Sequence, residues 1–460
     1  MKIQFWGGVG TVTGSQHILK SDGKQLLLEC GLFQGHRQEA EEINRHLPFA
    51  AREIDWCAVS HAHIDHIGNL PNLIKNGYPG PVLMTKPSVA LSRLLLLDSA
   101  KIQEADIKYL NKKRREKGEP PKEPIYTAAD AEHSLTRLRG IRYAHREKIG
   151  PFTLYLHDAG HILGSALIDI EVEGKRVLFT GDLGRKKMPI IRDPVQVDEV
   201  DILIMEATYG NRLHADYQDV RTRLAGIVNR VAARGGRIII PAFAVERAQE
   251  IVYNFKKLRQ ENAIPDIPIF VDSPLASRVT EVYRNSTAYF DQEAQALIDD
   301  QNHSPFDFPG LSYIEDANES KKLNTIEHPC IIIAPSGMCE AGRVLHHLKH
   351  SITDPKNLIL IVSFQAEHTL GRRLVERQPV VKIFGEDFPV RAEIEVMDEF
   401  SAHADRNGLL DYVRNMRIDR LQKVFLVHSE PEASAAMVDP LKDLGVPEVI
   451  IPKKGEEYEI

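Results

Sequence analysis

Paired cysteines and long apolar runs are both missing from this sequence of 460 residues. Its four cysteines, Cys30, Cys57, Cys330 and Cys339, lie far apart and form no C-x-x-C pair. This spacing excludes a zinc ribbon and a disulfide-rich scaffold, and we expect four buried free thiols. No apolar run approaches the about 20 residues that a membrane-spanning helix needs, and the N-terminus lacks a signal-peptide stretch. These absences predict no membrane contact and a cytoplasmic location.

An excess of positive charge is missing as well. The sequence has 58 Lys and Arg residues against 65 Asp and Glu residues, and its formal net charge is -7. This balance argues against a protein that coats nucleic acid nonspecifically, although a local basic channel stays open because clustering sets the local field. With 43% hydrophobic and 27% charged residues the composition is that of a globular protein, and its length predicts two or three domains.

Short apolar segments rich in β-branched residues recur along the chain. Their length and lack of alternation are typical of strands covered on both faces. They span residues 25–29, 56–60, 176–180, 201–205, 237–240, 268–271, 330–334, 358–362 and 424–427. Helical patterns separate several of them, at residues 219–234, before a Gly-Gly pair, and at 246–258. The sequence therefore predicts an α/β protein.

A third helical pattern covers residues 87–117 and ends in a basic run. The run contains Lys112, Lys113, Arg114, Arg115 and Lys117, and a proline-rich connector follows at residues 119–124. Because helix C-termini favour cations, we interpret the run as a solvated helix end. Contact with phosphates stays open as the alternative.

Ionisable residues follow four of the predicted strands, either directly or after a single glycine. They are His61, Asp182, Glu206 and His428. Loops at strand ends are where α/β folds assemble their sites. Four residues of ligand or acid/base type in such positions predict one convergent site.

The segment at residues 61–66 concentrates metal-ligand chemistry. It contains His61, His63, Asp65 and His66, and imidazole and carboxylate are the nitrogen and oxygen ligands that zinc prefers. In an extended turn His61 and His63 can face one ion, and Asp65 and His66 a second. Two metals about 3.5–4 Å apart suit hydrolysis of a phosphate or an acyl group.

Further motifs give this cluster a family resemblance. His161 lies in AGHILGSA and Asp182 in TGDLGR, and with H-x-H-x-D-H these stretches resemble the metallo-β-lactamase superfamily. EATYG at Glu206, FSAHAD at His403 and VH at His428 resemble signatures of its β-CASP nuclease branch. The resemblance extends over essentially the whole chain.

The resemblance implies an architecture and a set of ligands. Residues 1–208 and 396–460 would form a metallo-β-lactamase αββα sandwich, and residues 209–395 an inserted α/β β-CASP domain. Two zinc ions per chain are implied. The first would be held by His61, His63, His161 and Asp182, and the second by Asp65, His66, Asp182 and His428. A homodimer is a further expectation from the resemblance.

The implied activity is hydrolysis of phosphodiester bonds in single-stranded RNA by a hydroxide that two metals activate, leaving a 5′-phosphate and a 3′-hydroxyl. Asp65 would orient the hydroxide or accept its proton, and His403, kept protonated by Glu206, would be the general acid. His428 favours RNA, because the DNA-repair branch typically has valine there. The alternatives are a DNA nuclease of the same branch and a small-molecule ester or thioester hydrolase of the same fold. Internal and 5′-to-3′ terminal cleavage both stay open.

Weaker signals concern the substrate. The candidate substrate contacts are Arg247, Ser336, Arg343 and Arg372, of which Ser336 lies in a strand–turn–helix unit that can present backbone N–H groups to a phosphate. Three residues depart from the usual pattern of the family. Glu29 stands for the usual Asp, and Glu246 and Ser429 stand for common glycines.

Overall fold

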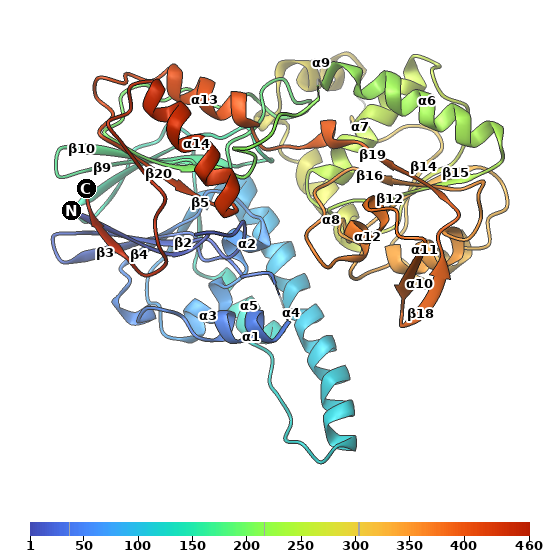
Figure 1. The fold of residues 1–460 in the computed structure, drawn as a ribbon, viewed down its shortest axis with the longest axis horizontal. Helices are drawn as coiled ribbons and strands as arrows, with labels where there is room; N and C mark the ends of the chain where they lie inside the picture. The colour runs from blue at the N-terminus through green and yellow to red at the C-terminus, as the bar shows by residue number, and fades with distance from the viewer. Residues whose placement is uncertain (36, 216, 302–303) are drawn as a thin grey trace. The chain divides into compact units, whose positions relative to one another are not determined.

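The computed structural model describes residues 1–35, 37–215, 217–301 and 304–460, and it divides into two compact units (Figure 1). Unit 1 contains residues 1–186, 192–213 and 403–460. Unit 2 contains residues 187–191 and 214–402. Unit 1 is therefore built from segments on both sides of unit 2 in the sequence.

Unit 1 contains two seven-stranded mixed sheets. The first has the order β22-β1-β2-β3-β4-β5-β6 and the second β21-β20-β11-β10-β9-β8-β7. The strands of the first sheet are β1 (Lys2–Gly7), β2 (Gln16–Ser21), β3 (Lys24–Leu28), β4 (Trp56–Ala58), β5 (Val82–Thr85), β6 (Leu138–Ile141) and β22 (Glu457–Glu459). Those of the second are β7 (Glu147–Ile149), β8 (Phe152–Asp158), β9 (Ala166–Val172), β10 (Lys175–Phe179), β11 (Ile202–Glu206), β20 (Lys423–Val427) and β21 (Glu448–Ile450).

The two sheets pack face to face over one apolar core. Buried side chains of β1 to β3, such as Phe5 and Leu19, share a cluster with Phe152, Ile168 and Phe179 of the second sheet. Period-2 alternation supplies this core, because every second residue of a strand points to the same face. Unit 1 is thus a sandwich around an apolar interior.

Helices cover both outer faces of the sandwich (Figure 1). One side holds α1 (Arg37–Arg45), α2 (Ile64–Ile67), α3 (Leu70–Lys75), α4 (Lys86–Glu116) and α5 (Ala128–Leu135), with α4 against β5 and β6. The other side holds α13 (Arg406–Arg414) and α14 (Pro431–Asp443). Leu409 and Met437 of these two helices join Leu178 and Leu203 in a second core. The layering is αββα.

Unit 2 is a six-stranded sheet in the order β14-β13-β15-β12-β16-β19, and all its neighbouring strands run parallel. Its strands are β12 (Arg237–Pro241), β13 (Ile269–Val271), β14 (Leu311–Tyr313), β15 (Cys330–Ala334), β16 (Leu358–Ile361) and β19 (Glu393–Val396), with β17 (Val380–Ile383) and β18 (Glu386–Pro389) as a separate hairpin. Its helices are α6 (Val220–Ala233), α7 (Arg247–Gln260), α8 (Pro274–Arg284), α9 (Gln292–Gln301), α10 (Ala317–Leu323), α11 (Val344–Ser351) and α12 (Leu370–Val375). Buried isoleucines of β12, β15 and β16 supply its core.

The α/β class predicted from the sequence is confirmed, and every uninterrupted apolar segment predicted as a strand forms one. The strands that the sequence did not reveal are mostly antiparallel or at sheet edges, such as β8, β9, β17 and β18. All four cysteines are buried free thiols, as expected. Among the described residues, no helix combines the length and the apolar character that crossing a bilayer requires.

Candidate metal centre and active site

The predicted ligands come from loops at the ends of strands in unit 1. His61 follows β4 closely, and His63 caps the N-terminus of α2, which carries Asp65 and His66. The other residues follow the second sheet: His161 between β8 and β9, Asp182 after β10, and His428 directly after β20. Segments far apart in the sequence thus meet at one end of the sandwich.

Four of these residues form a first donor group. His61, His63, His161 and Asp182 each present one ligand atom, all within 4.8 Å of one another. Nδ1 of His63 lies 3.0 Å from Nε2 of His61 and 3.4 Å from Nε2 of His161. Both Nε2 atoms lie 3.4 Å from Oδ2 of Asp182. Nitrogen and carboxylate donors therefore converge on one point.

Asp65, His66 and His428 form a second donor group. Oδ2 of Asp65 lies 3.4 Å from Nε2 of His428 and 3.8 Å from Nε2 of His66. Asp182 connects the two groups, because its other oxygen, Oδ1, lies 3.4 Å from Nε2 of His66. One carboxylate thus faces the first group with one oxygen and the second with the other.

Electrostatics suit a cation in the first group. Burial lowers the pKa of His61 and His161 well below the usual value, and it lowers the pKa of His63 to about 4. At neutral pH these three imidazoles are therefore uncharged, which is the form that binds metals. Their nitrogens face one another at hydrogen-bonding distances, an arrangement that a cation among them satisfies.

In the second group the charges of neighbouring residues outweigh the effect of burial, and this group also favours a positive charge. Burial alone would lower the pKa of His66, but Asp182 and Asp65 raise it well above its usual value. Burial would raise the pKa of Asp182, but His428 and His66 hold it well below its usual range. Nε2 of His66 and Oδ1 of Asp182 face each other at 3.4 Å without the geometry of a hydrogen bond, and neither has another hydrogen-bond partner among the described residues. Buried donor atoms of this kind fit metal ligands, and the nitrogen and oxygen set is one that zinc accepts.

Glu206 and His403 lie beside Asp182 and form a third cluster with it. Nδ1 of His403 lies 3.0 Å from Oε1 of Glu206, which also accepts the N–H of Leu183 at 2.7 Å. Burial alone would lower the pKa of His403, but Glu206 and Asp182 raise it to about 9. Nε2 of His403 faces Asp182 at 3.9 Å. The imidazole is thus oriented by a fixed carboxylate, and its second nitrogen faces the metal-binding side.

Further residues support the ligands from behind. Glu29 accepts the N–H of Ser60 at 2.7 Å through Oε1, and its Oε2 lies 3.3 Å from Nδ1 of His66. Oγ of Ser60 lies 2.9 Å from Nδ1 of His61, and Oγ1 of Thr208 lies 3.2 Å from Nδ1 of His428. These partners restrict the ring orientations of the ligands. Glu29, which stands where the family usually has Asp, therefore contacts His66 with its longer side chain.

Two close approaches between loops require glycine. A Cβ at Gly181, whose φ is +51°, would lie 2.4 Å from Cβ of Ser60. A Cβ at Gly184 would lie 1.8 Å from the carbonyl oxygen of Gly160, beside His161. The loop that carries Asp182 can therefore lie against the loops that carry the histidines only because it lacks side chains at these two positions.

The other two departures from the usual pattern have structural partners in the interior. Glu246 has a φ of +65°, a conformation that favours glycine, and its buried carboxylate accepts a hydrogen bond from the hydroxyl of Tyr283. The negative charge of Glu246 is thus buried rather than exposed. Oγ of Ser429 pairs with Oγ of Ser434 at the start of α14.

Three candidate substrate residues lie in unit 2 with partners of their own. Arg247 is 7% exposed and forms an ion pair with Glu250. Arg343 donates to Asp272 at 2.6 Å and to the carbonyl oxygen of Glu315 at 2.6 Å. Oγ of Ser336 accepts backbone N–H groups of its own loop. Substrate contact by these residues stays a prediction.

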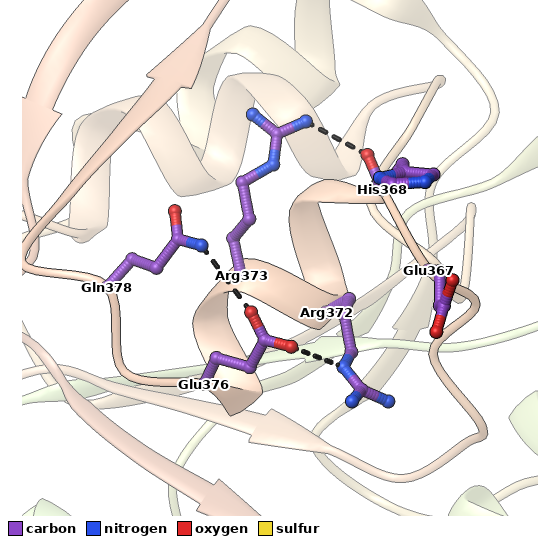
Figure 2. A pocket seen from close by; sticks show the side chains of 6 residues that line it. All are labelled: Glu367, His368, Arg372, Arg373, Glu376 and Gln378. Carbon is purple, nitrogen blue, oxygen red and sulfur yellow. Dashed lines mark hydrogen bonds and ion pairs between the residues drawn. The ribbon is translucent and has the colours of Figure 1, made fainter.

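The fourth candidate, Arg372, lines a hollow of about 450 Å³ around α12 (Figure 2). Its Nε donates to Glu376 at 2.7 Å, and Arg373 donates to the carbonyl oxygen of His368 at 3.0 Å. Glu367 and Gln378 complete the lining. Its charges are of both signs, so the hollow does not select for anions on charge alone.

Ser60 and Thr208 are the site residues that the sequence did not reveal. Each carried a weak signal: Ser60 directly precedes His61, and Thr208 lies in the EATYG segment. Only the fold discloses that Thr208 contacts His428, because 220 residues separate them.

Comparison with protein families matches three segments of the chain. Residues 9–235 match the metallo-beta-lactamase superfamily, and residues 248–374 match the Beta-Casp domain. Residues 387–452 match the Zn-dependent metallo-hydrolase RNA specificity domain.

Individual relatives match over most of the chain. Ribonuclease TTHA0252 of Thermus thermophilus is 36% identical, over 95% of this chain and 95% of its own length. An RNase J-like protein of Methanocaldococcus jannaschii is 30% identical over 98% of both chains. Cleavage and polyadenylation specificity factor 73 of Drosophila melanogaster is 29% identical over 92% of this chain and 59% of its own length. A solved structure of an Enterococcus faecalis protein of unknown function has the same fold, with a TM-score of 0.54 and 13% identity over 99% of both chains.

Proposed function

The chain belongs to the β-CASP branch of the metallo-β-lactamase superfamily, and from this membership we propose that it is a zinc-dependent ribonuclease that cleaves single-stranded RNA. As a member of this branch it is a metal-dependent hydrolase that acts on RNA. The observation that carries the finer proposal is the position of Asp182, which faces His161 with one oxygen and His66 with the other. Such a shared carboxylate supports a pair of zinc ions rather than one.

The two donor groups described above would hold these ions. We assign His61, His63, His161 and Asp182 to the first ion and Asp65, His66, Asp182 and His428 to the second. When bound at these residues, two zinc ions would supply a Lewis acid that would neutralise charge on the phosphate and lower the pKa of water.

The residues of the chain supply the proton transfers. Asp65, whose side chain is 22% exposed, orients the attacking water or accepts its proton. His403 donates a proton from Nε2 to the leaving 3′-oxygen, while Glu206 holds Nδ1–H on the opposite side of the ring. The products are then a 3′-hydroxyl and a 5′-phosphate.

Three further expectations accompany this function. We propose residues 1–208 and 396–460 as the catalytic domain and residues 209–395 as the inserted domain. Units 1 and 2 support this division, although the proposed boundaries differ from theirs by several residues. The cytoplasmic location and the homodimer stay predictions.

A cleavage assay tests the function. Pure protein with zinc is incubated with single-stranded RNA labelled at its 5′ end, and in parallel with DNA of the same sequence. We expect RNA to be cleaved and the His403→Ala variant to be slower by a factor of about 10² or more, the range for removal of a general acid.

Three outcomes would contradict the proposal. Preferential cleavage of DNA would favour a DNA nuclease, and turnover of a thioester without cleavage of either nucleic acid would favour a small-molecule hydrolase. Cleavage of RNA at equal rates by the wild type and by His403→Ala would remove His403 from the mechanism. The lengths of the labelled products separate internal from terminal cleavage.

A further inference from the structure

The distal half of α4 forms an exposed basic projection of unit 1. The buried residues of this helix all lie between Pro87 and Ala100, and none lies in its remaining turns. In Figure 1 the helix continues beyond α1, α3 and α5, and the chain returns alongside it before α5. We call residues 101–124, the distal half of α4 with this return segment, the basic arm.

The basic arm has a defined structure rather than a frayed end. Nδ2 of Asn111 donates to the carbonyl oxygen of Lys122 at 2.8 Å, and the N–H of Lys122 donates back to Oδ1 at 2.8 Å. Arg114 donates to the carbonyl oxygen of Pro120 at 2.7 Å, and Lys122 forms an ion pair with Glu41 at 2.8 Å. Arg114 therefore maintains the fold of the arm, and Lys122 connects the arm to α1.

Four of its other cations form a stripe on one exposed face. Lys101, Lys108, Lys112 and Arg115 are exposed, and at 3.6 residues per turn they fall within an arc of about 60°. None of them forms an ion pair with any residue that the structure describes. Six of the ten residues from 108 to 117 are basic and one is acidic, in a chain with a net charge of -7.

An aromatic side chain flanks the stripe. Tyr109 is 60% exposed and Ile102, two turns earlier on the same face, is 51% exposed. Nζ of Lys113 lies 4.6 Å from the centre of the Tyr109 ring. Stabilisation of the helix C-terminus accounts for cations in the last turn only, so it explains neither Lys101 and Lys108 nor the exposed ring.

We propose that the basic arm binds single-stranded RNA, with the stripe on phosphates and Tyr109 stacked on a base. Proteins that bind single strands without sequence preference combine a basic track with aromatic platforms in this way. The proposal rests on the proposed function for its choice of ligand. Thr85, directly before α4, bonds to the loop that carries His161, and from Thr85 to Lys108 the helix rises about 35 Å. The arm would therefore hold a portion of a long RNA away from the proposed metal centre.

The first test measures binding to a fluorescent single-stranded RNA of about 30 nucleotides. Lys108→Gln, Lys112→Gln and Arg115→Gln are combined in one variant, with His403→Ala added to prevent cleavage. The matched control, also with His403→Ala, combines Lys442→Gln, Lys453→Gln and Lys454→Gln, which remove the same charge from other exposed positions of unit 1. We expect the arm variant to bind roughly tenfold more weakly, and the slope of log K against log salt to fall by about 2, at about 0.7 per phosphate contact.

The second test separates RNA from other polyanions. Tyr109→Ala should weaken binding by about fivefold or more, whereas Tyr109→Phe should bind like the wild type, because stacking needs the ring and not the hydroxyl. If Tyr109→Ala has no effect and polyglutamate competes as well as RNA, the arm is a surface for acidic proteins and the proposal is overturned. An arm variant with the affinity and salt slope of the control would also overturn it.

The third test distinguishes failure of this proposal from failure of the proposed function. Bis(p-nitrophenyl) phosphate and the long RNA are compared as substrates of otherwise wild-type arm variants. We expect the rate on the small diester to stay unchanged and KM for the long RNA to rise about tenfold, in line with the weakened binding. Absence of hydrolysis by the wild type would refute the enzyme function alone, because the binding measurements do not depend on turnover.

Discussion

At the scale of single residues, Thr208 shows how a hydroxyl selects the tautomer of a ligand. Its Oγ1 donates to the carbonyl oxygen of His428 at 3.0 Å and lies 3.2 Å from Nδ1 of the same residue. A hydroxyl has one hydrogen, which Oγ1 gives to the carbonyl oxygen, so Oγ1 accepts the hydrogen bond from Nδ1–H. Nε2 is then unprotonated and directed toward Asp65. Thr208 is therefore a positioning residue for the second donor group.

Replacement of Thr208 tests this assignment. We expect Thr208→Val, which keeps the shape and removes the hydroxyl, to lower the affinity for the more weakly bound zinc by about 10- to 100-fold. Thr208→Ser keeps the hydroxyl and should restore most of the affinity. The measurement is a zinc titration of apoprotein against a chromophoric chelator. Equal affinities for the Val and Ser variants would contradict the assignment.

Asp158 at the end of β8 gives a pH-dependent prediction. Burial raises the pKa of its carboxyl group to about 7, although the N–H of Gly160 opposes this shift. Between pH of about 4 and 7 the folded chain keeps a proton that the unfolded chain releases, so this group makes the free energy of unfolding fall as pH rises.

The variant Asp158→Asn lacks this titration. Relative to the wild type, its free energy of unfolding should rise by roughly 1 kcal/mol per pH unit between about pH 5 and 7. Urea unfolding across this range measures the difference. Parallel curves for the two proteins would show that Asp158 titrates normally.

At the scale of elements, a close approach at a glycine allows two loops of the candidate metal centre to pack together. Gly184→Ala should separate the Asp182 loop from the His161 loop, because the added Cβ would overlap the carbonyl group of Gly160. We expect a lower melting temperature and weaker zinc binding, with a loss of stability of about 1–3 kcal/mol.

The control for this substitution is Gly226→Ala in the middle of α6. A Cβ there meets nothing within 4 Å, and alanine favours the helix. This variant should gain stability by about 0.5–1 kcal/mol. A Gly184→Ala protein as stable as Gly226→Ala would show that the two loops tolerate separation.

Strands that consist of an uninterrupted apolar run could be predicted from the sequence. β15 was predicted with both ends correct, because residues 330–334 form an uninterrupted apolar strand of a parallel sheet. β8 and β9 were missed, because their antiparallel pairing mixes polar residues such as Thr153 and Asp169 into the strands. The local His61–His66 pattern disclosed its chemistry, whereas the contact of Thr208 with His428 depends on tertiary pairing of β11 with β20.

The basic arm is a second case in which the sequence pattern predicted the residues but not their tertiary surroundings. The sequence disclosed the charges at the end of α4, and we interpreted them as a solvated helix end. Two structural facts distinguish a projecting arm from an ordinary helix terminus: only the proximal half of α4 has buried residues, and Tyr109 in the distal half is exposed. The sequence pattern of a helix does not show how far along the helix the packing of neighbouring elements extends.

At the scale of the whole molecule, all the proposed metal ligands belong to unit 1. Zinc should therefore stabilise unit 1 and leave the intrinsic stability of unit 2 unchanged. At free zinc about 100-fold above the dissociation constant, the stabilisation is about 3 kcal/mol. Differential scanning calorimetry with zinc and with a chelator measures it. Thermograms that coincide under the two conditions would contradict a structural contribution of the metal.

The division of unit 1 by unit 2 also sets the order in which a growing polypeptide acquires its parts. A nascent chain that ends at Ala402 already contains every grouped residue from His61 to Glu206, together with unit 2. It still lacks His403, His428 and the strand β20 that lies beside β11. Translation therefore supplies the proposed general acid and the last proposed ligand only after the whole of unit 2, so a nascent chain that ends before His403 lacks two residues on which the proposed hydrolysis depends.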